Sequence, residues 1–466
     1  MPQGALPPGS RPLQWLVALA FFMETLDATV VNTALPAMAR ALGASPLAMQ
    51  SVVVSYALTL AALIPISGWA ADRFGTRRVY LAATSLFTVG SLACALSGSL
   101  TQLVAARVLQ GVGGSMLLPV GRLAILRAFP GPGYIDALAF VSMAALIGPL
   151  AGPPVGGYLV QYASWHWIFL INLPIGLVGF CAIWRFMPED RRANVGPFDW
   201  LGFLQVVAFM VSVSLGLDGL ADLRLPLGLS LCLLCFGLAA LSAYVLHARR
   251  AQRPLFSLRL FRSTSFSVGI LGNFFARMGS SSVPFVMPLF LQLCMGYGPA
   301  LAGLSMVPVA GASMLAKPIA ARVILRAGYR RFLTVNTTLV GLAIASFSLL
   351  GRGTPFILQV AMLLVFGVIN SMQFTAMNTL TLRDLTPAQA GAGNSLYSMV
   401  QMLAMSLAVA AAGALLAAVA HTAQDRRTAF SVTFACMGAM TVSSAWIFAQ
   451  LADPRRGKPR PGTRPT

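Results

Sequence analysis

Two acidic side chains lie inside a long apolar stretch near the beginning of the chain. Glu24 and Asp27 fall within the run 13–35, which contains no other charged residue. An ionised carboxylate at the centre of a membrane helix costs about 2.5–3.5 kcal/mol, so such residues normally face a cavity or a partner. Three residues apart, the two acids share one side of a helix and can titrate as a coupled pair. This spacing predicts a site that takes up and releases protons.

Each acid also has a structural explanation. Glu24 could reach interfacial water and only anchor its helix, and Asp27 could make a hydrogen bond to a neighbouring helix. Basic residues inside apolar runs are equally scarce, namely Arg107, Arg277 and Lys317. An unpaired guanidinium is costly in such a run, so Arg107 should have a partner. Arg277 could face a central cavity, whereas Lys317 could extend its amine to the membrane surface.

The composition of the whole chain is that of a membrane protein. Of 466 residues, 57% are apolar and 9% are charged, whereas soluble domains carry about 25% charged residues. These values exclude a soluble enzyme, a secreted disulfide-linked protein and a disordered protein. All six cysteines lie in apolar runs, and neither histidine nor carboxylate accompanies Cys232 and Cys235. The cysteines therefore indicate packing rather than a redox or zinc site.

Fourteen apolar runs are long enough to cross a membrane, which takes about 20 residues each. They are 13–35, 47–71, 79–98, 101–121, 137–160, 166–187, 198–217, 225–246, 266–293, 299–321, 332–350, 355–380, 390–419 and 428–450. A twelve-span alternative would treat 198–217 and 225–246 as soluble or re-entrant segments. We favour fourteen because both runs are long enough to cross.

The basic residues predict a topology. The formal net charge is +20, and most arginines form short clusters between the apolar runs. With the amino terminus inside, 24 of the 32 basic residues fall in cytoplasmic segments and five fall outside. Positively charged loops are retained in the cytoplasm. We therefore expect both termini to be cytoplasmic, no nucleic-acid partner, and a basic tail, 453–466, near anionic lipid.

Two connections between spans share one pattern. Residues 73–78 and 326–331 both read Arg-x-Gly-x-Arg-Arg and follow the second and tenth spans. This repetition predicts two six-span halves, 1–190 and 263–452, with two inserted spans in 191–262. Paired halves of this kind bind a ligand at their interface and rock against each other. Gly75 permits a tight reversal, and Asp72 could engage Arg73, Arg77 or a helix end to latch the cytoplasmic side.

Five motifs occur in an order that resembles the major facilitator superfamily, in its 14-span drug:proton antiporter branch. They are residues 26–36, LDATVVNTALP; 68–78, GWAADRFGTRR; 107–113, RVLQGVG; 148–157, GPLAGPPVGG; and 165–176, WHWIFLINLPIG. The resemblance runs from the first span to the last. It implies an all-α integral membrane protein with the major facilitator fold, two six-helix halves and two extra helices.

The resemblance also implies roles for single residues. It places the proton-coupling acid at Asp27, beside Glu24, and has Arg107 facing the first span. We expect Arg107 to favour the ionised carboxylate in one conformation and to move away in the other; a static ion pair is the alternative. The gating segment would comprise Asp72, Arg73, Gly75 and Arg77. Thr76 stands where the family usually has a basic residue, and Leu325 replaces the acid in the second copy, so the latch is expected in the first half.

The run 148–157 matches the antiporter signature of that family. Its glycines recur every four residues, which predicts a smooth stripe for close helix packing, and its prolines should bend the helix. A packing seam without further function is the alternative. The signature residues are Gly148, Pro149, Gly152, Pro153, Gly156 and Gly157.

Polar residues inside the spans are candidates for lining a substrate cavity, although each could instead make a hydrogen bond between helices. They are Asn32, Gln110, Asn273, Arg277, Asn370, Gln373 and Asn378.

These patterns together predict a monomeric proton-coupled antiporter that exports small amphipathic compounds across a bacterial inner membrane. Its partners would be the small-molecule substrate, protons and membrane lipid, without a cofactor. No nucleophile with a base and no phosphate-binding loop is visible, which argues against an enzyme and against ATP. The alternatives are an exporter of one metabolite, such as an amino acid, sugar or siderophore, and a membrane sensor that does not transport. The sequence carries no signal for or against a periplasmic adaptor.

Overall fold

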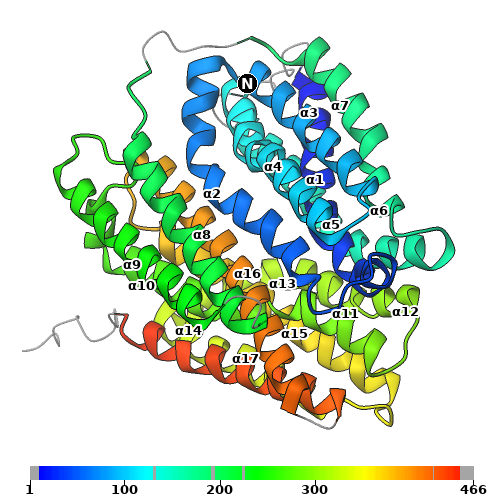
Figure 1. The fold of residues 1–466 in the computed structure, drawn as a ribbon. Helices are drawn as coiled ribbons and strands as arrows, with labels where there is room; N and C mark the ends of the chain where they lie inside the picture. The colour runs from blue at the N-terminus through cyan, green and yellow to red at the C-terminus, as the bar shows by residue number, and fades with distance from the viewer. Residues whose placement is uncertain (1–9, 130–132, 190–194, 223–225, 423–424, 452–466) are drawn as a thin grey trace, which may run out of the picture.

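The structure is a computed structural model that describes residues 10–129, 133–189, 195–222, 226–422 and 425–451. The predicted basic tail, 453–466, and the predicted boundary at 190–191 lie outside these residues. Every regular element in the described part of the chain is a helix (Figure 1). The all-α fold class is thereby confirmed.

The helices of the first part of the chain are α1 (Ser10–Ala41), α2 (Gln50–Phe74), α3 (Thr76–Ala95), α4 (Leu100–Ala128), α5 (Gly133–Tyr162), α6 (Trp167–Leu170) and α7 (Asn172–Phe186). Two further helices follow, α8 (Trp200–Asp222) and α9 (Leu227–Arg250). The remaining elements are η1 (Leu258–Arg262), α10 (Thr264–Ser280), α11 (Val283–Leu293), α12 (Pro299–Leu304), α13 (Val307–Ala327), α14 (Tyr329–Ser346), η2 (Phe347–Leu349), α15 (Phe356–Leu382), α16 (Pro387–Thr422) and α17 (Arg426–Ala449).

Fourteen helical segments in the described part of the chain are long and apolar enough to cross a membrane. They coincide with the fourteen predicted runs, including Trp200–Leu217 and Leu227–Arg250, whose status the sequence left open. A helix satisfies its own backbone hydrogen bonds inside lipid. A run of apolar residues of sufficient length is therefore enough to predict a span.

Three of the predicted spans contain a break that the apolar runs did not reveal. The breaks separate α6 from α7, α10 from α11, and α12 from α13. In each case the first helix ends four residues before a proline, which lacks the N–H that would donate to that carbonyl. The pairs are Leu170 with Pro174, Ser280 with Pro284, and Leu304 with Pro308.

The two repeated connections have the same backbone conformation. Gly75 joins α2 to α3 with φ 90° and ψ 143°, and Gly328 joins α13 to α14 with φ 77° and ψ 152°. Only glycine adopts this region without strain. The shared sequence pattern therefore reflects one tight turn that the chain builds twice.

The helices form two groups that lie side by side (Figure 1). In the first group α1 packs along α5, and α2 and α3 pack on α4; in the second, α14 and α10 pack on α17, and α13 packs on α15. The groups meet where α2 contacts α16 and where α5 contacts α12. These contacts define the surface on which any site between the groups must lie.

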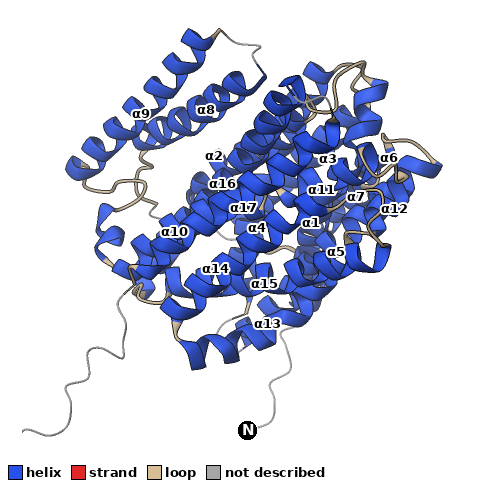
Figure 2. Cartoon of the chain, turned by 90° about the horizontal axis from the view of Figure 1, so that it is seen from below, coloured by secondary structure: helices blue, strands red, loops and turns tan. Residues whose placement is uncertain are grey.

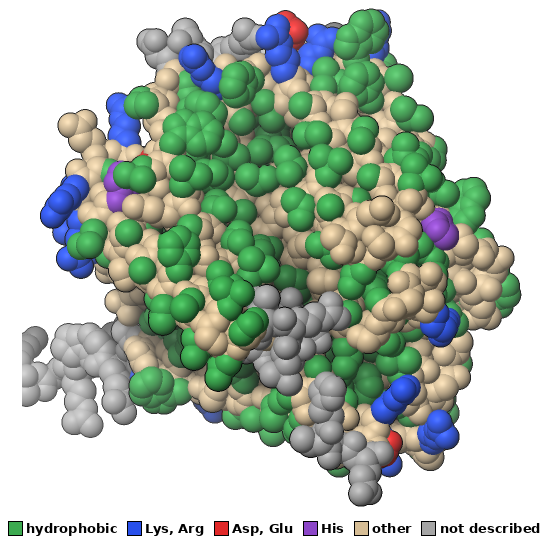
Figure 3. Space-filling view, viewed as in Figure 1, with side chains coloured by type: hydrophobic (Ala, Val, Ile, Leu, Met, Phe, Trp, Pro, Cys, Tyr) green, Lys and Arg blue, Asp and Glu red, His purple; other side chains and the backbone are tan. Residues whose placement is uncertain are grey.

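The inserted helices α8 and α9 stand at one edge of the molecule (Figure 2). They pack on each other, and α8 also contacts α2 and α16, one helix from each group. On the face that Figure 3 shows, apolar side chains are widespread, while Lys and Arg lie towards the rim. Large side chains such as Phe236 and Leu238 are more than half exposed, as expected where lipid replaces water.

Candidate functional site

The carboxylate of Asp27 is the centre of a buried polar cluster inside the first group of helices. Its Oδ2 accepts a hydrogen bond from Arg107 Nη1 at 2.6 Å, and its Oδ1 accepts from Gln110 Nε2 and Asn172 Nδ2, both at 2.8 Å. Ser91 Oγ accepts from the same two amides at 2.7 and 3.3 Å. Helices α1, α3, α4 and α7 thus each contribute one or two side chains to one cluster, which we call the polar cluster.

The guanidinium of Arg107 has further partners besides Asp27. Its Nη1 also donates to Gln110 Oε1 at 2.6 Å, and its Nε donates to the backbone carbonyl of Val52 at 3.3 Å. The ring of Tyr56 lies 4.0 Å from its Cζ atom, and the ring of Phe169 lies 5.9 Å away. Donor pairing and cation–π contact together compensate for removing this charge from water.

The side chains of Asp27 and Arg107 are 0% and 1% exposed. Breaking a buried pair by removing one charge typically costs about 3–5 kcal/mol, because the other charge is left without compensation. A movement of α4 relative to α1 would separate the two charges, which makes the pair a candidate for coupling protonation to conformation.

The predicted small-residue stripe on α5 packs against a row of threonines on α1. A Cβ atom on Gly148 would clash with Thr25 Oγ1, and one on Gly152 would clash with Thr29 Oγ1. Gly156 meets the backbone oxygen of Val30 in the same way. The threonine hydroxyls donate back along α1, for example Thr29 Oγ1 to the carbonyl of Thr25 at 3.0 Å. We call this contact the Gly–Thr seam; it packs α5 along the part of α1 that carries Asp27.

The same helix also touches the second group. A Cβ on Gly157 would clash with the carbonyl oxygen of Pro299, and one on Gly303 would clash with that of Pro153. Across this contact Gln161 Oε1 accepts a hydrogen bond from the backbone N–H of Ala300 at 3.0 Å. The antiporter-like run 148–157 therefore lies between α1 and α12, and it joins the two groups of helices.

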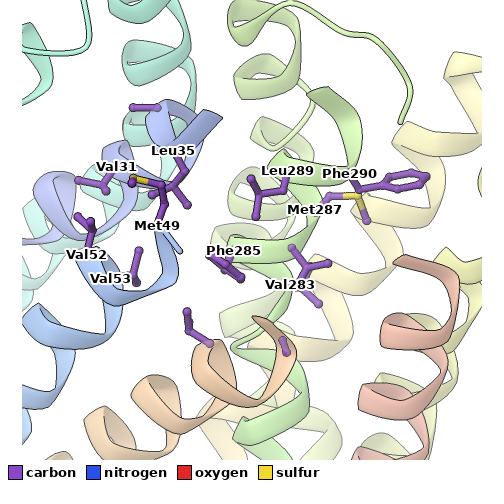
Figure 4. Close-up of a cluster of buried hydrophobic side chains, with 14 of the residues drawn as sticks. Val31, Leu35, Met49, Val52, Val53, Val283, Phe285, Met287, Leu289 and Phe290 are labelled. Carbon is purple, nitrogen blue, oxygen red and sulfur yellow. The ribbon is translucent and has the colours of Figure 1, made fainter. Parts of the chain in front are cut away.

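An apolar core closes the molecule at the end of α1 and the start of α2. Val31, Leu35 and Val53 from the first group lie opposite Phe285 and Leu289 of α11 (Figure 4). Gln292 Nε2 adds a hydrogen bond to the carbonyl of Thr33 at 3.0 Å. We call this region the sealed end, because one cluster of buried apolar side chains spans both groups there.

At the opposite end a cavity of about 440 Å³ lies between the groups. Glu24 lines it and is itself 6% exposed, and its Oε2 has no hydrogen-bond partner. Arg122 of α4, an exposed residue, also lines the cavity. Uncharged polar side chains of three helices also line the cavity, namely Ser67 of α2, Ser115 of α4, and Asn394, Ser395, Ser398 and Gln401 of α16. The two acids of the first span therefore lie in different surroundings, Asp27 in the polar cluster and Glu24 at the cavity.

The connectors of the inserted helices form part of the cavity wall. Leu255 and Phe256, between α9 and η1, line the cavity. Asp199, just before α8, accepts hydrogen bonds from His247 Nε2 at 2.8 Å and from the N–H groups of Leu255 and Gly202 at 2.9 Å. Burial acts to raise the pKa of Asp199, but these hydrogen bonds outweigh it and lower the pKa below its ordinary value.

Tyr244 of α9 holds the same connector. Its hydroxyl donates to the carbonyl of Phe256 at 3.0 Å and accepts from the N–H of Phe256 at 2.8 Å. At the other connector, Trp69 of α2 packs against Phe198 and Trp200 and donates to the carbonyl of Gly196 at 3.3 Å. The insertion is therefore fastened to the first group beside the cavity.

The predicted gating segment adopts the expected tight turn at Gly75, and it has partners on two further helices. Asp72 pairs with Arg127 at the end of α4. Arg77 donates to the carbonyl of Trp184 at the end of α7 and lies 3.9 Å from Glu189. The segment thus ties α2 and α3 to α4 and α7, and Arg127 was the partner that local sequence could not indicate.

The predicted cavity residues of the second group lie away from the cavity just described. Arg277 Nε donates to Asn273 Oδ1 at 3.3 Å, and its guanidinium lies 4.5 Å from the ring of Phe374. Gln373 bonds Asn336 at 2.8 Å and Thr337 at 2.5 Å. None of Asn32, Gln110, Asn273, Arg277, Asn370 and Gln373 is among its lining residues. Their assignment to a substrate cavity stays a prediction.

Three residues of the site were not predicted from the sequence, namely Asn172, Ser91 and Arg122. Asn172 lies in a quoted motif, but its role depends on the break after Leu170, which starts α7 at Asn172. Ser91 is an ordinary serine in an apolar span. Arg122 was counted as a topological charge. A proline four residues after the break was the available signal for Asn172, whereas only the packing of helices could reveal Ser91 and Arg122.

Comparison with known proteins agrees with this architecture. The sequence model described as Major Facilitator Superfamily matches residues 17–409. Proteins named "Putative multidrug resistance protein MdtD" are similar: that of Salmonella heidelberg (strain SL476) is 47% identical over 460 residues, which is 96% of each chain. That of Pectobacterium carotovorum subsp. carotovorum (strain PC1) is 49% identical over 403 residues, 86% of each chain.

Solved structures share the fold at low sequence identity. A D-xylose-proton symporter aligns with a TM-score of 0.69 at 15% identity, covering 96% of this chain and 99% of that chain. The POT family transporter PepTSo aligns with a TM-score of 0.71 at 14% identity, covering 94% and 97%. On the extent of the family match and the identity to these relatives, the chain belongs to the Major Facilitator Superfamily.

Proposed function

We propose that this protein is a proton-coupled antiporter that exports small amphipathic compounds from the bacterial cytoplasm. The names of its relatives support the substrate class, since they are called multidrug resistance proteins. The observation that carries the proton coupling is the pair of Asp27 and Arg107, two charges buried together at 2.6 Å within the membrane-spanning helices.

The arrangement supports alternating access. The sealed end closes one side of the interface between the groups, while the cavity remains at the other side, where α4 ends and α16 begins. With both termini cytoplasmic, as the charge distribution predicts, the cavity faces the cytoplasm. Rocking of the groups about α2, α5, α12 and α16 would close the cavity and open the sealed end.

In this cycle Arg107 decides the charge of Asp27. Beside Arg107, Asp27 is ionised and the cavity is available to substrate. When the groups rock, Arg107 moves away, and Asp27 takes a proton from the outer side because an isolated carboxylate is costly in the membrane. Glu24 exchanges its proton with the cavity. The segment of Asp72, Arg73, Gly75 and Arg77 latches the cytoplasmic side through the ties to α4 and α7.

The test uses everted vesicles that contain the full chain. A proton gradient is imposed, a fluorescent amphipathic substrate is added, and substrate accumulation and proton release are followed together. We expect Asp27→Asn to abolish gradient-driven accumulation while the protein remains monomeric and folded. Asp136→Asn, at an exposed acid in the first turn of α5, should leave accumulation unchanged. Accumulation by Asp27→Asn at the parental rate would refute the coupling role of Asp27.

A further inference from the structure

The charges that line the cavity are of opposite sign. Of its lining residues, Glu24 on α1 and Arg122 on α4 are the two that carry a charge. Among the described residues no salt bridge joins them, although their charges interact across the cavity. A cavity for a simple cation gains nothing from the arginine, and a cavity for a simple anion gains nothing from the glutamate.

The glutamate is left in an unusual condition for a buried group. It is 6% exposed, and its Oε2 makes no hydrogen bond. On the facing helix, α16, the Nε2 atom of the buried Gln401 also has no partner. Buried polar atoms are rarely left unsatisfied, and an oxygen that faces a cavity can accept a hydrogen bond from a molecule bound there.

The rest of the lining suits a molecule with an apolar body. Leu60, Ile64, Leu118 and Met402 contribute carbon surface between the charged and amide groups. The volume of about 440 Å³ falls within the roughly 300–1,000 Å³ of ligand pockets. A ligand of drug size can therefore reach the carboxylate and the guanidinium at the same time.

From these observations we infer that the cavity binds zwitterions, small molecules with an apolar body, one cationic group for Glu24 and one anionic group for Arg122. This inference rests on the proposed function, of which it names the substrate class. The anionic group gains a forked donor from the guanidinium, and the cationic group satisfies Glu24 Oε2. Neither charge of the cavity is then left unpaired when substrate fills it.

The test is a binding experiment with three matched probes. They are a fluoroquinolone that carries one carboxylate and one piperazine ammonium, its carboxyl methyl ester, which is a cation, and its N-acetyl derivative, which is an anion. Binding to the purified full chain in lipid nanodiscs is measured at pH 7 by isothermal titration calorimetry. We expect the zwitterion to bind at least fivefold more tightly than either derivative.

Two variants assign each charge. In Glu24→Gln the zwitterion should bind no better than the N-acetyl derivative, because the ammonium group is no longer recognised. In Arg122→Gln it should bind no better than the ester. The matched controls Asp136→Asn and Arg185→Gln, which remove one charge of each sign outside the cavity, should keep the selectivity. Thermal unfolding of each variant shows whether the chain is folded. If a variant does not fold, the comparison of the three probes on the parent chain still tests the inference.

A preference for the zwitterion below fivefold overturns the inference, as does tighter binding of the ester or of the N-acetyl derivative. The proposed function has its own outcome. If the zwitterion binds selectively but causes no proton release in everted vesicles, the inference stands and proton-coupled antiport is wrong. If all three probes drive proton release equally well, antiport stands and the inference is wrong.

Discussion

Asp27 and Arg107 form an ion pair 2.6 Å long whose two side chains are 0% and 1% exposed. The pair joins α1 to α4, and each partner has further hydrogen bonds within the polar cluster. A charge pair so completely enclosed responds to any relative movement of these two helices, since separation would leave two unsatisfied charges in an apolar surrounding.

The first prediction concerns the shape of the basic partner. Arg107 donates in three directions, to Asp27, Gln110 and the carbonyl of Val52. A lysine keeps the charge but cannot reproduce this planar fork. We expect Arg107→Lys to lower the initial rate of gradient-driven export at least tenfold in everted vesicles. Arg185→Lys, outside the polar cluster, is the matched control, and an unchanged rate for Arg107→Lys would show that charge alone suffices.

The second prediction concerns the Gly–Thr seam. Gly152→Ala would place a Cβ against Thr29 Oγ1, and overpacking of this kind costs about 1–3 kcal/mol. The thermal unfolding midpoint in detergent should fall, and adding Thr29→Ala should restore part of the loss. Gly311→Ala is the control, because nothing lies within 4 Å of that position; it should be neutral or stabilise by about 0.5–1 kcal/mol. Equal effects at Gly152 and Gly311 would contradict the seam.

The third prediction concerns the repeated turn. Gly75 and Gly328 have φ of 90° and 77°, a region that other residues occupy at a cost of about 1–3 kcal/mol. Gly75→Ala and Gly328→Ala should each lower the unfolding midpoint by a similar amount. Transport should suffer more from Gly75→Ala, since the turn at Gly75 carries Asp72 and Arg77. An equal loss of transport in the two variants would contradict a specific gating role of the turn at Gly75.

The fourth prediction is a dependence of stability on pH. The pKa of Asp199 is lowered in the folded protein, so its ionised form stabilises the fold at pH values above the ordinary aspartate pKa, about 3.9. That contribution should be lost as the pH falls through the lower folded value. Compared with Asp199→Asn, the parent chain should unfold at a higher temperature at pH 7, and the difference should shrink below pH 4. A difference independent of pH would contradict the role of the carboxylate charge.

Much of the fold follows from the sequence because a membrane imposes a simple rule. Each span needs about 20 apolar residues, and the fourteen predicted runs coincide with the fourteen helical segments. The two tight turns at Gly75 and Gly328 could also be predicted, because few residues other than glycine tolerate positive φ. The breaks in three spans could not be predicted. A proline follows each break by four residues, but other prolines in this chain, such as Pro65, lie inside unbroken helices.

The sequence by itself determined which charged side chains would be costly to bury in the membrane, namely Glu24, Asp27 and Arg107. Only the tertiary structure decided how they are used. Residues three apart on one helix point in directions about 60° apart, so neighbouring helices α4, α7 and α16 settle that Asp27 enters the polar cluster while Glu24 faces the cavity. Burial costs are local properties of a residue type, whereas the partners that compensate for them come from distant parts of the chain.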